Sequence, residues 1–173
     1  MTVLKDANRL NLVGEAVAKA GWGSSQLSKY ADNVKNLTPN NPALKQFDEF
    51  ADVAGSGSYL TKEAKLLDDV GVQNELKAAT IKRDSGDPIE KLQEKIDIPD
   101  AEGEIDVVSK SAAIEVKTSP NNDDLDKWKS QVTRLVNYAK ANGLKAEYWH
   151  QNPIHPVRLK FLDDNAVKAF PIP

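Results

Sequence analysis

The chain has 173 residues and a formal net charge of −3, which fits one domain of ordinary size or a domain with a small appendage. Apolar residues make up 40% and charged residues 28% of the chain, so we expect a packed core, and the acidic balance excludes a strongly basic protein that coats nucleic acid. The sequence has no cysteine, which excludes disulfides, thiolate zinc sites, iron–sulfur clusters and a cysteine nucleophile.

The N-terminus and the apolar runs of the sequence predict no membrane segment. No run approaches the ~18 consecutive apolar residues of a membrane span. Residues 1–9 lack the basic and apolar regions of a secretory signal. We therefore expect a soluble protein with no membrane span, which could still be a piece of a larger exported protein.

The N-terminal third of the chain predicts helices. Apolar residues recur near helical spacing in segments of residues 1–54 that glycine and proline separate. The stretch Ala54-Gly-Ser-Gly-Ser58 is the most linker-like of the chain. We therefore predict a helical region over 1–57 and a second domain over 58–173.

The second domain is predicted to combine helices and strands. The expected elements, in chain order, are a helix from about 58 to 79, a loop over 84–88, a short helix or strand over 89–98, strands over 104–108 and 113–117, a strong amphipathic helix over 124–142, a strand over 145–151, a short helix over 156–165 and a last strand over 166–170. This order predicts an α/β fold in which a mixed sheet is flanked by helices.

The strands over 104–108 and 113–117 predict a hairpin with one apolar and one charged face. Side chains alternate between the two faces of a strand. The apolar face is expected to hold Ile105, Val107, Ile114 and Val116, and the charged face Glu104, Asp106, Glu115 and Lys117.

The register of this hairpin predicts a pair of carboxylates. If Val108 pairs with Ala113 across the short turn, Asp106 lies opposite Glu115, with Cβ atoms ~5 Å apart. Two like charges at that distance need a shared proton or a divalent cation. With Lys117 one step farther along the same face, the pattern favours a metal-and-water site. The alternative is a surface hairpin whose charged face is simply solvated.

Gly103-Glu-Ile-Asp106, followed after a short gap by Ile114-Glu-Val-Lys117, resembles the core motif of the PD-(D/E)XK nuclease superfamily. The resemblance covers roughly residues 60–150 and implies a PD-(D/E)XK-like mixed sheet. It implies Mg²⁺ or Mn²⁺ as the cofactor, with Zn²⁺ as an alternative. The implied metal ligands are Asp106, Glu115 and the backbone carbonyl of Val116, and Lys117 is the implied catalytic lysine that activates or orients the attacking water.

The family often has a further acidic residue on a helix before the hairpin. Glu75 is the first choice for a catalytic role, because it lies late on the helix that precedes the loop over 84–88. Glu63 and Glu90 are alternatives. The identity of this acid, and with it the number of metal ions, stays open.

The helix over 124–142 carries two stripes of side chains. The apolar stripe consists of Leu125, Trp128, Val132, Leu135, Val136 and Ala139, and predicts core packing. The second consists of Lys127, Gln131, Arg134 and Tyr138. A glutamine facing the site is common in the family, and Lys127, Gln131, Arg134 and Thr118 are candidates for contact with nucleic acid. The alternative is an ordinary solvated helix edge, with Thr118 merely ending a strand.

A helical segment followed by such a nuclease resembles the C-terminal toxin regions of bacterial contact-dependent growth inhibition and related polymorphic toxins. This resemblance implies a metal-dependent phosphodiesterase that hydrolyses tRNA or DNA. The toxin would be secreted as part of a larger cell-surface effector, would act in the target-cell cytoplasm and would have a cognate immunity protein. One alternative is a housekeeping repair or junction nuclease with the same site. Another is a non-catalytic binding module that keeps the fold.

Overall fold

A computed structural model describes residues 50, 53, 70–96 and 103–173 of the chain. Its elements, in order, are α5 (Val70–Asp84), β1 (Ile89–Ile96), β2 (Gly103–Ser109), β3 (Ala112–Lys117), α6 (Leu125–Ala141), β4 (Lys145–His150), α7 (Pro156–Asp164) and β5 (Lys168–Pro171). The helices predicted within 1–54, and the predicted boundary after residue 57, lie outside the described residues.

The elements predicted from residue 84 onward are confirmed, with small shifts at their ends. The ambiguous segment over 89–98 forms strand β1. The helix predicted to end near Ala79 was placed too short, because it continues to Asp84. Ile81 still packs against the core, and Lys82 and Arg83 in the last turn suit the negative end of the helix dipole.

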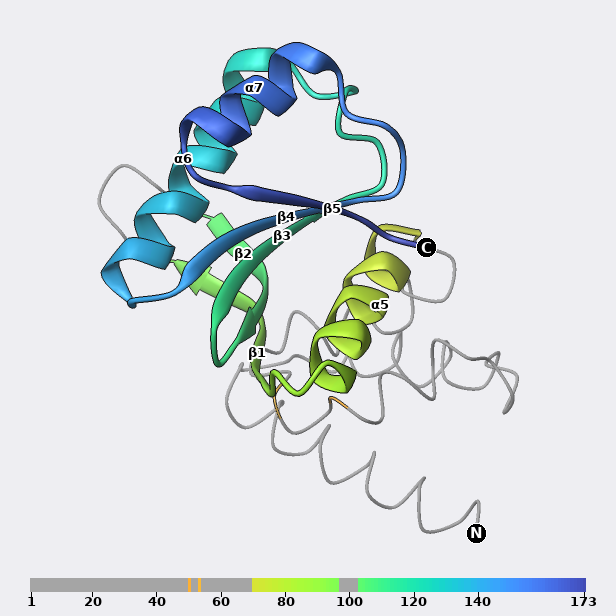
Figure 1. The fold of residues 1–173 in the computed structure, drawn as a ribbon, viewed down its shortest axis with the longest axis vertical. Coiled ribbons are helices and arrows are strands. Elements are labelled where there is room, and N and C mark those ends of the chain that lie inside the picture. Colours follow the sequence, from red (N-terminus) through yellow and green to blue (C-terminus); the bar gives the residue numbers. More distant parts are fainter. Residues whose placement is uncertain (1–49, 51–52, 54–69, 97–102) are drawn as a thin grey trace, which may run out of the picture.

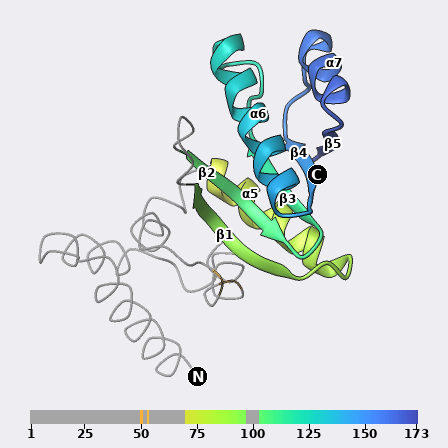
Figure 2. The ribbon, with the colours of Figure 1, turned by 90° about the vertical axis from the view of Figure 1, so that its left-hand side faces the viewer.

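The five strands form one mixed sheet in the order β1-β2-β3-β4-β5. β1, β2 and β3 are antiparallel neighbours, whereas β3, β4 and β5 are parallel. Parallel neighbours need a crossover, which α6 supplies between β3 and β4 and α7 between β4 and β5. Helices α6 and α7 lie on one face of the sheet and α5 on the other (Figures 1 and 2). The predicted α/β class, a mixed sheet flanked by helices, is confirmed.

Each face of the sheet has its own hydrophobic core. The core on the α5 face includes Val72, Leu76, Ala78, Ala79, Leu92, Val107, Ile114 and Val116. The core on the α6 face includes Ile105, Val108, Ala113, Trp128, Val132, Leu135, Tyr148 and Leu162. Helix α6 is fixed in place by its predicted apolar stripe, of which Trp128, Val132 and Leu135 are fully buried. The sheet between the two cores therefore gives the hairpin a rigid support.

The backbone register of the hairpin confirms the pairing of Val108 with Ala113, and Val107 pairs with Ile114. The predicted sharing of one face by Ile105 and Val107 is wrong. Val107 packs in the core on the α5 face, whereas Ile105 packs in the core on the α6 face. Alternation along β2 is therefore interrupted at the residue between them, Asp106.

The tip of the hairpin is fastened to the loop after α5. The Asp87 carboxylate accepts hydrogen bonds from the Ser109 hydroxyl at 2.8 Å and from the Ser111 hydroxyl at 2.5 Å and backbone N–H at 3.1 Å. Lys82 lies 3.1 Å from the same carboxylate and 2.8 Å from Glu147. Burial would raise the pKa of Asp87, but the hydrogen bonds from Ser111, Ser109 and Lys82 outweigh it and lower the pKa.

We expect Asp87→Asn to lower the free energy of unfolding by about 1–3 kcal/mol at neutral pH, because charge-assisted hydrogen bonds are lost. A lowered pKa means that the Asp87 contribution is present above the unfolded-state pKa and is lost as the pH falls through the folded-state pKa. The difference between wild type and variant should therefore shrink on acidification below about pH 4. Urea unfolding at several pH values measures it, and a pH-independent difference would contradict this account.

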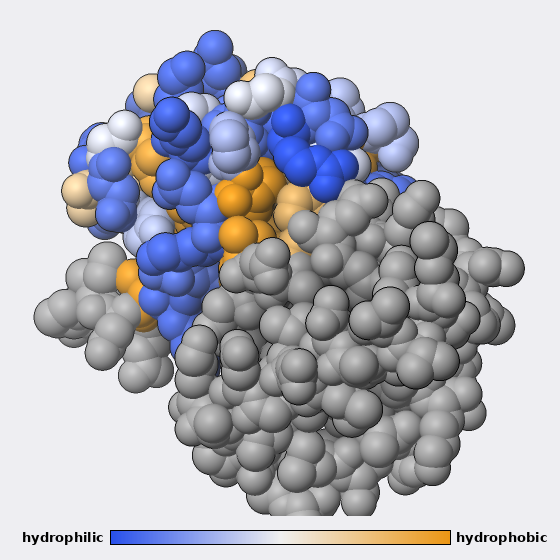
Figure 3. Space-filling model, turned by 90° about the horizontal axis from the view of Figure 1, so that it is seen from below, coloured by the Kyte–Doolittle hydropathy of each residue, from blue (hydrophilic) through white to orange (hydrophobic). Residues whose placement is uncertain are grey.

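No helix among the described residues is long and apolar enough to cross a membrane. Seen from below in the frame of Figure 1, the visible part of the described surface is mainly hydrophilic, with hydrophobic residues at its centre and in smaller spots toward its left side (Figure 3).

Candidate functional site

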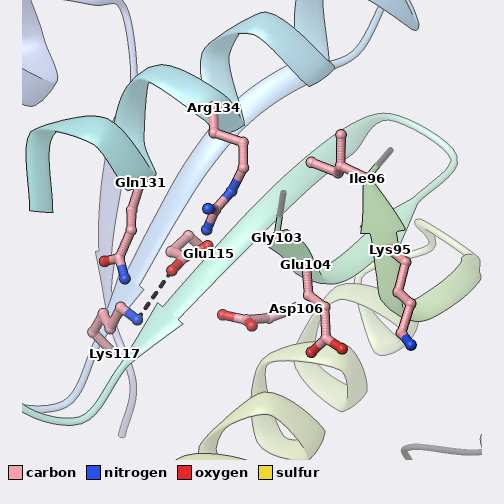
Figure 4. A pocket seen from close by; sticks show the side chains of 9 residues that line it. All are labelled: Lys95, Ile96, Gly103, Glu104, Asp106, Glu115, Lys117, Gln131 and Arg134. Atoms are coloured by element: carbon pink, nitrogen blue, oxygen red, sulfur yellow. Dashed lines mark ion pairs between the residues drawn. The ribbon is translucent and has the colours of Figure 1, made fainter. Parts of the chain in front are cut away.

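A pocket of about 730 Å³ opens where β2 and β3 separate beyond the Val107–Ile114 pair, next to helix α6. Its lining residues are Lys95 and Ile96 from β1, Gly103, Glu104 and Asp106 from β2, Glu115 and Lys117 from β3, and Gln131 and Arg134 from α6 (Figure 4). The pocket thus joins five residues that the sequence singled out for chemistry or substrate contact: Asp106, Glu115, Lys117, Gln131 and Arg134.

Glu115 and Lys117 form the centre of the pocket. Their side chains lie on the same face of β3, as predicted, and the Lys117 ammonium lies 3.1 Å from Oε1 of Glu115 (Figure 4). The Glu115 residue is only 2% exposed, and its Oε2 atom is buried without a hydrogen-bond partner. A buried carboxylate oxygen in that state is costly unless a ligand binds it.

The surroundings of Glu115 and Lys117 raise the pKa of both groups. Burial raises the pKa of Glu115, and the opposing attractions of Lys117 and Arg134 do not fully offset it. Burial would lower the pKa of Lys117, but the carboxylates of Glu115 and Asp106 outweigh it and raise that pKa. Lys117 is therefore an ammonium at neutral pH, suited to orient water or phosphate by charge rather than to remove a proton.

Asp106 lies where the hairpin ladder ends. The backbone pairs of β2 and β3 stop at Val107–Ile114, so the predicted Asp106–Glu115 pair is not part of the ladder. Instead, Oδ2 of Asp106 accepts a hydrogen bond from the backbone N–H of Val116 at 2.7 Å. The Asp106 carboxylate thus takes the place of a backbone carbonyl as the acceptor for this N–H. Its side chain lies in the opening between β2 and β3 (Figure 4).

The two carboxylates still influence each other electrostatically. The pKa of Asp106 is raised well above its usual range, first by burial and then by the negative charges of Glu115 and Glu75. The N–H of Val116 and the charge of Lys117 oppose this rise. Two carboxylates whose ionisation is opposed first by burial, and for Asp106 also by neighbouring negative charges, are an environment that a divalent cation would relieve.

Gln131 and Arg134 reach the pocket from α6, one helical turn apart (Figure 4). The Oε1 atom of Gln131 is buried without a hydrogen-bond partner. The Arg134 guanidinium lies over Gly103, where any side-chain carbon would overlap its Nη1 and Cζ atoms and would lie 2.7 Å from Nε. A side chain at residue 103 would therefore push the guanidinium of Arg134 out of its present position. The sequence motif included this glycine, but nothing in the sequence identified Arg134 as its neighbour.

Other candidates from the sequence lie outside the pocket lining. Lys127 is exposed on α6, and Glu90 is exposed on β1. The Thr118 hydroxyl accepts a hydrogen bond from the Asn74 amide at 3.0 Å. Glu63 lies outside the described residues.

Glu75, the first choice for the upstream acid, lies on α5 and is not among the residues that line the pocket. It is 9% exposed, and its Oε2 atom accepts a hydrogen bond from the Gln93 amide at 2.9 Å. Its negative charge contributes to the raised pKa of Asp106, after burial and the charge of Glu115. Sequence reasoning placed Glu104 on the charged face of the hairpin, but it missed Gln93 and Lys95 as neighbours of the site, because both are brought there by the pairing of β1 with β2.

Comparison with known proteins finds no matching family model, no similar curated protein and no similar solved structure. Within residues 50, 53, 70–96 and 103–173, no group of three or more His, Asp or Glu side chains is arranged to hold a metal ion. The pocket lining holds the carboxylates of Glu104, Asp106 and Glu115, whereas Val116, whose carbonyl the resemblance implies as a ligand, is not among the lining residues. Oxygen donors of this kind, completed by water, fit Mg²⁺ or Mn²⁺, and the unpartnered Oε2 of Glu115 supports the fit.

Proposed function

We propose that the chain is a metal-dependent nuclease that hydrolyses phosphodiester bonds at this pocket. The observation that carries the proposal is the convergence of Asp106, Glu115 and Lys117, from adjacent strands, with Arg134 and Gln131 above them. The residues of the sequence motif therefore meet in one pocket large enough for a phosphate and its flanking sugars. The resemblance to PD-(D/E)XK nucleases supports the same reaction.

Asp106, Glu115 and the carbonyl of Val116 would hold the cation. A bound Mg²⁺ or Mn²⁺ supplies Lewis acidity, which acidifies a bound water and draws charge from a phosphate oxygen. The residues of the chain provide the remaining requirements, which are orientation of the water and neutralisation of the charge that develops on the phosphate.

Lys117 would orient the attacking water and stabilise negative charge, because its ammonium is held at the pocket by Glu115. Arg134 would bind a non-bridging phosphate oxygen, since a guanidinium donates two parallel hydrogen bonds to phosphate. The unpartnered Oε1 of Gln131 can accept a hydrogen bond from the water or from a substrate hydroxyl. In the reaction, the water oxygen bonds to phosphorus and gives up a proton to solvent, while the P–O bond to the leaving sugar oxygen breaks and that oxygen takes up a proton from solvent.

The biological setting that the sequence resemblance favours is a growth-inhibition toxin acting on tRNA or DNA. Such a toxin needs a cognate immunity protein to protect the cell that makes it. Co-expression with the product of the next reading frame should then give a stable complex and restore growth. A chain that is harmless to cells, and that cuts nucleic acid in vitro, would instead favour the repair or junction nuclease.

The proposed activity is tested by incubating the purified chain with total RNA and with plasmid DNA, in the presence of Mg²⁺, Mn²⁺, Zn²⁺ or EDTA. We expect cleavage of one of the two polymers that depends on the cation and stops with EDTA. The absence of cleavage under every metal condition would favour a binding module that keeps the fold.

Gly103→Ala tests the contribution of Arg134. The added methyl group displaces the guanidinium from its place over residue 103, and we expect cleavage to slow about tenfold, equivalent to ~1.4 kcal/mol. In a double-mutant cycle, Gly103→Ala should cost nothing further once Arg134→Ala is present. Rate constants measured for the four proteins check this, and additive losses would show that residue 103 acts by another route.

A further inference from the structure

We propose that Asn74 is a positioning residue for Lys117, because its buried amide holds together the two chain segments that leave strands β3 and β4. This role rests on the proposed function, in which the Lys117 ammonium orients the attacking water. Asn74 itself lies on α5 and is not among the residues that line the pocket.

The end of β3 that carries Lys117 depends on its pairing with β4. The backbone pairs between β2 and β3 end at Val107–Ile114. Beyond that point, β3 stays paired with β4 as far as Lys117 and His150, and the backbone N–H of Gln151 donates to the Lys117 carbonyl at 3.1 Å. The position of Lys117 is therefore set by how firmly the ends of β3 and β4 are held together.

The Asn74 side chain joins the residues that directly follow these two strands. Its Nδ2 atom donates to Oγ1 of Thr118 and to Oε1 of Gln151, both at 3.0 Å. Thr118 is the residue after Lys117, and Gln151 is the residue whose N–H bonds to the Lys117 carbonyl. One amide thus fixes both segments to α5, and through them the backbone at Lys117.

The burial of Asn74 points to a use for its amide beyond stability. Asn74 is 1% exposed, and its Oδ1 atom is buried without a hydrogen-bond partner. An unpartnered buried acceptor is unfavourable. A leucine of similar size would avoid that cost in a helix whose Val72 and Leu76 pack in the core. The donor half of the amide, which joins the two strand ends, is therefore the functional part of this side chain.

The hydrogen bonds of this amide can be removed from either end. Asn74→Leu removes the donor and keeps the size of the side chain. Thr118→Val removes one acceptor at a half-buried position, whereas Thr118→Ser keeps it. Thr80→Val is the matched control, because it removes a hydrogen bond of 2.8 Å to the Leu76 carbonyl within the same helix. Single-turnover cleavage is measured for each variant alone and combined with Lys117→Ala, and circular dichroism establishes folding.

We expect Asn74→Leu to slow cleavage about 10- to 100-fold, because a misplacement of about 1 Å in a catalytic group has an effect of that size. Thr118→Val should slow cleavage less, and Thr118→Ser and Thr80→Val should cleave at the wild-type rate. In the Lys117→Ala background, neither Asn74→Leu nor Thr118→Val should slow cleavage further, because both act through Lys117.

Losses that persist in full in the Lys117→Ala background overturn the role of Asn74 alone, as do wild-type rates in folded Asn74→Leu or Thr118→Val. If Asn74→Leu does not fold, the same comparison is made with Thr118→Val. A wild type that cuts no nucleic acid overturns the proposed function, and this role with it.

Discussion

Replacement of Lys117 by alanine should reduce metal-dependent cleavage by about 10²–10³-fold, the usual cost of removing one group that stabilises charge in the transition state. The ammonium of Lys117 lies 3.1 Å from Glu115, and neighbouring carboxylates raise its pKa, so it brings a fixed positive charge to the pocket. Single-turnover rates at saturating metal measure the loss.

The controls for Lys117→Ala must separate the loss of this particular positive charge from a loss of folding stability. Lys91→Ala removes the same charge from the exposed side of β1, where Lys91 pairs with Glu94 at 2.5 Å, and should cleave at the wild-type rate. Lys117→Met keeps the apolar length of the side chain, and circular dichroism establishes that each variant is folded. Full activity in a folded Lys117→Ala protein would remove this residue from the site.

Divalent cation should stabilise the fold through Asp106 and Glu115. A ligand present at a hundred times its dissociation constant adds ~2.7 kcal/mol to the free energy of unfolding. For a chain of this size, that corresponds to a rise of roughly 5–10 °C in the thermal midpoint. Thermal denaturation of wild type with increasing Mg²⁺ or Mn²⁺ measures this rise.

Asp106→Asn should abolish the response to metal without destabilising the metal-free protein. The raised pKa of Asp106 means that its ionised form is less favourable in the folded state than in the unfolded state, so the stability it costs grows as the pH rises through its unfolded-state pKa. The amide removes that cost and can still accept the hydrogen bond from Val116. Asp164→Asn, an exposed change of the same charge, should keep the response. A similar metal-dependent rise in Asp106→Asn would place the cation elsewhere.

Much of the hairpin could be predicted from the sequence because its determinants are local. The short polar turn and the β-branched residues on each side fix the pairing of Val108 with Ala113. The same reasoning placed Glu115 and Lys117 on one face of β3. The helix after the hairpin was equally accessible, since its apolar stripe matches the residues that are buried in α6.

The departure from regularity at Asp106 could not be predicted, because strict alternation carries no signal for it. It coincides with an irregular residue of the neighbouring strand, Gln93, whose left-handed backbone is not typical of glutamine. The surroundings of Glu75 are similarly non-local. Its position on the helix made it the first choice, but its hydrogen bond with Gln93 depends on the packing of α5 against β1.

The position of Arg134 could also be predicted only in part from the sequence. Its spacing along the helix placed it on the correct stripe, but the close approach to Gly103 depends on the position of α6 relative to the start of β2. The exposed Lys127 occupies the same predicted stripe and does not line the pocket. Helical periodicity thus predicts which residues share one side of the helix. The tertiary arrangement determines which of those residues reach the pocket.

The central claim is that Asp106 and Glu115 hold a cation that phosphodiester hydrolysis requires. It is tested most directly by the single-turnover cleavage rate of wild type and Glu115→Gln, measured against Mg²⁺ or Mn²⁺ concentration on the nucleic acid that wild type cuts. We predict a saturable metal dependence for wild type and a folded Glu115→Gln protein with its rate reduced by about 10²–10³-fold. Cleavage by Glu115→Gln at the wild-type rate, or cleavage by wild type that persists in EDTA, would contradict the claim.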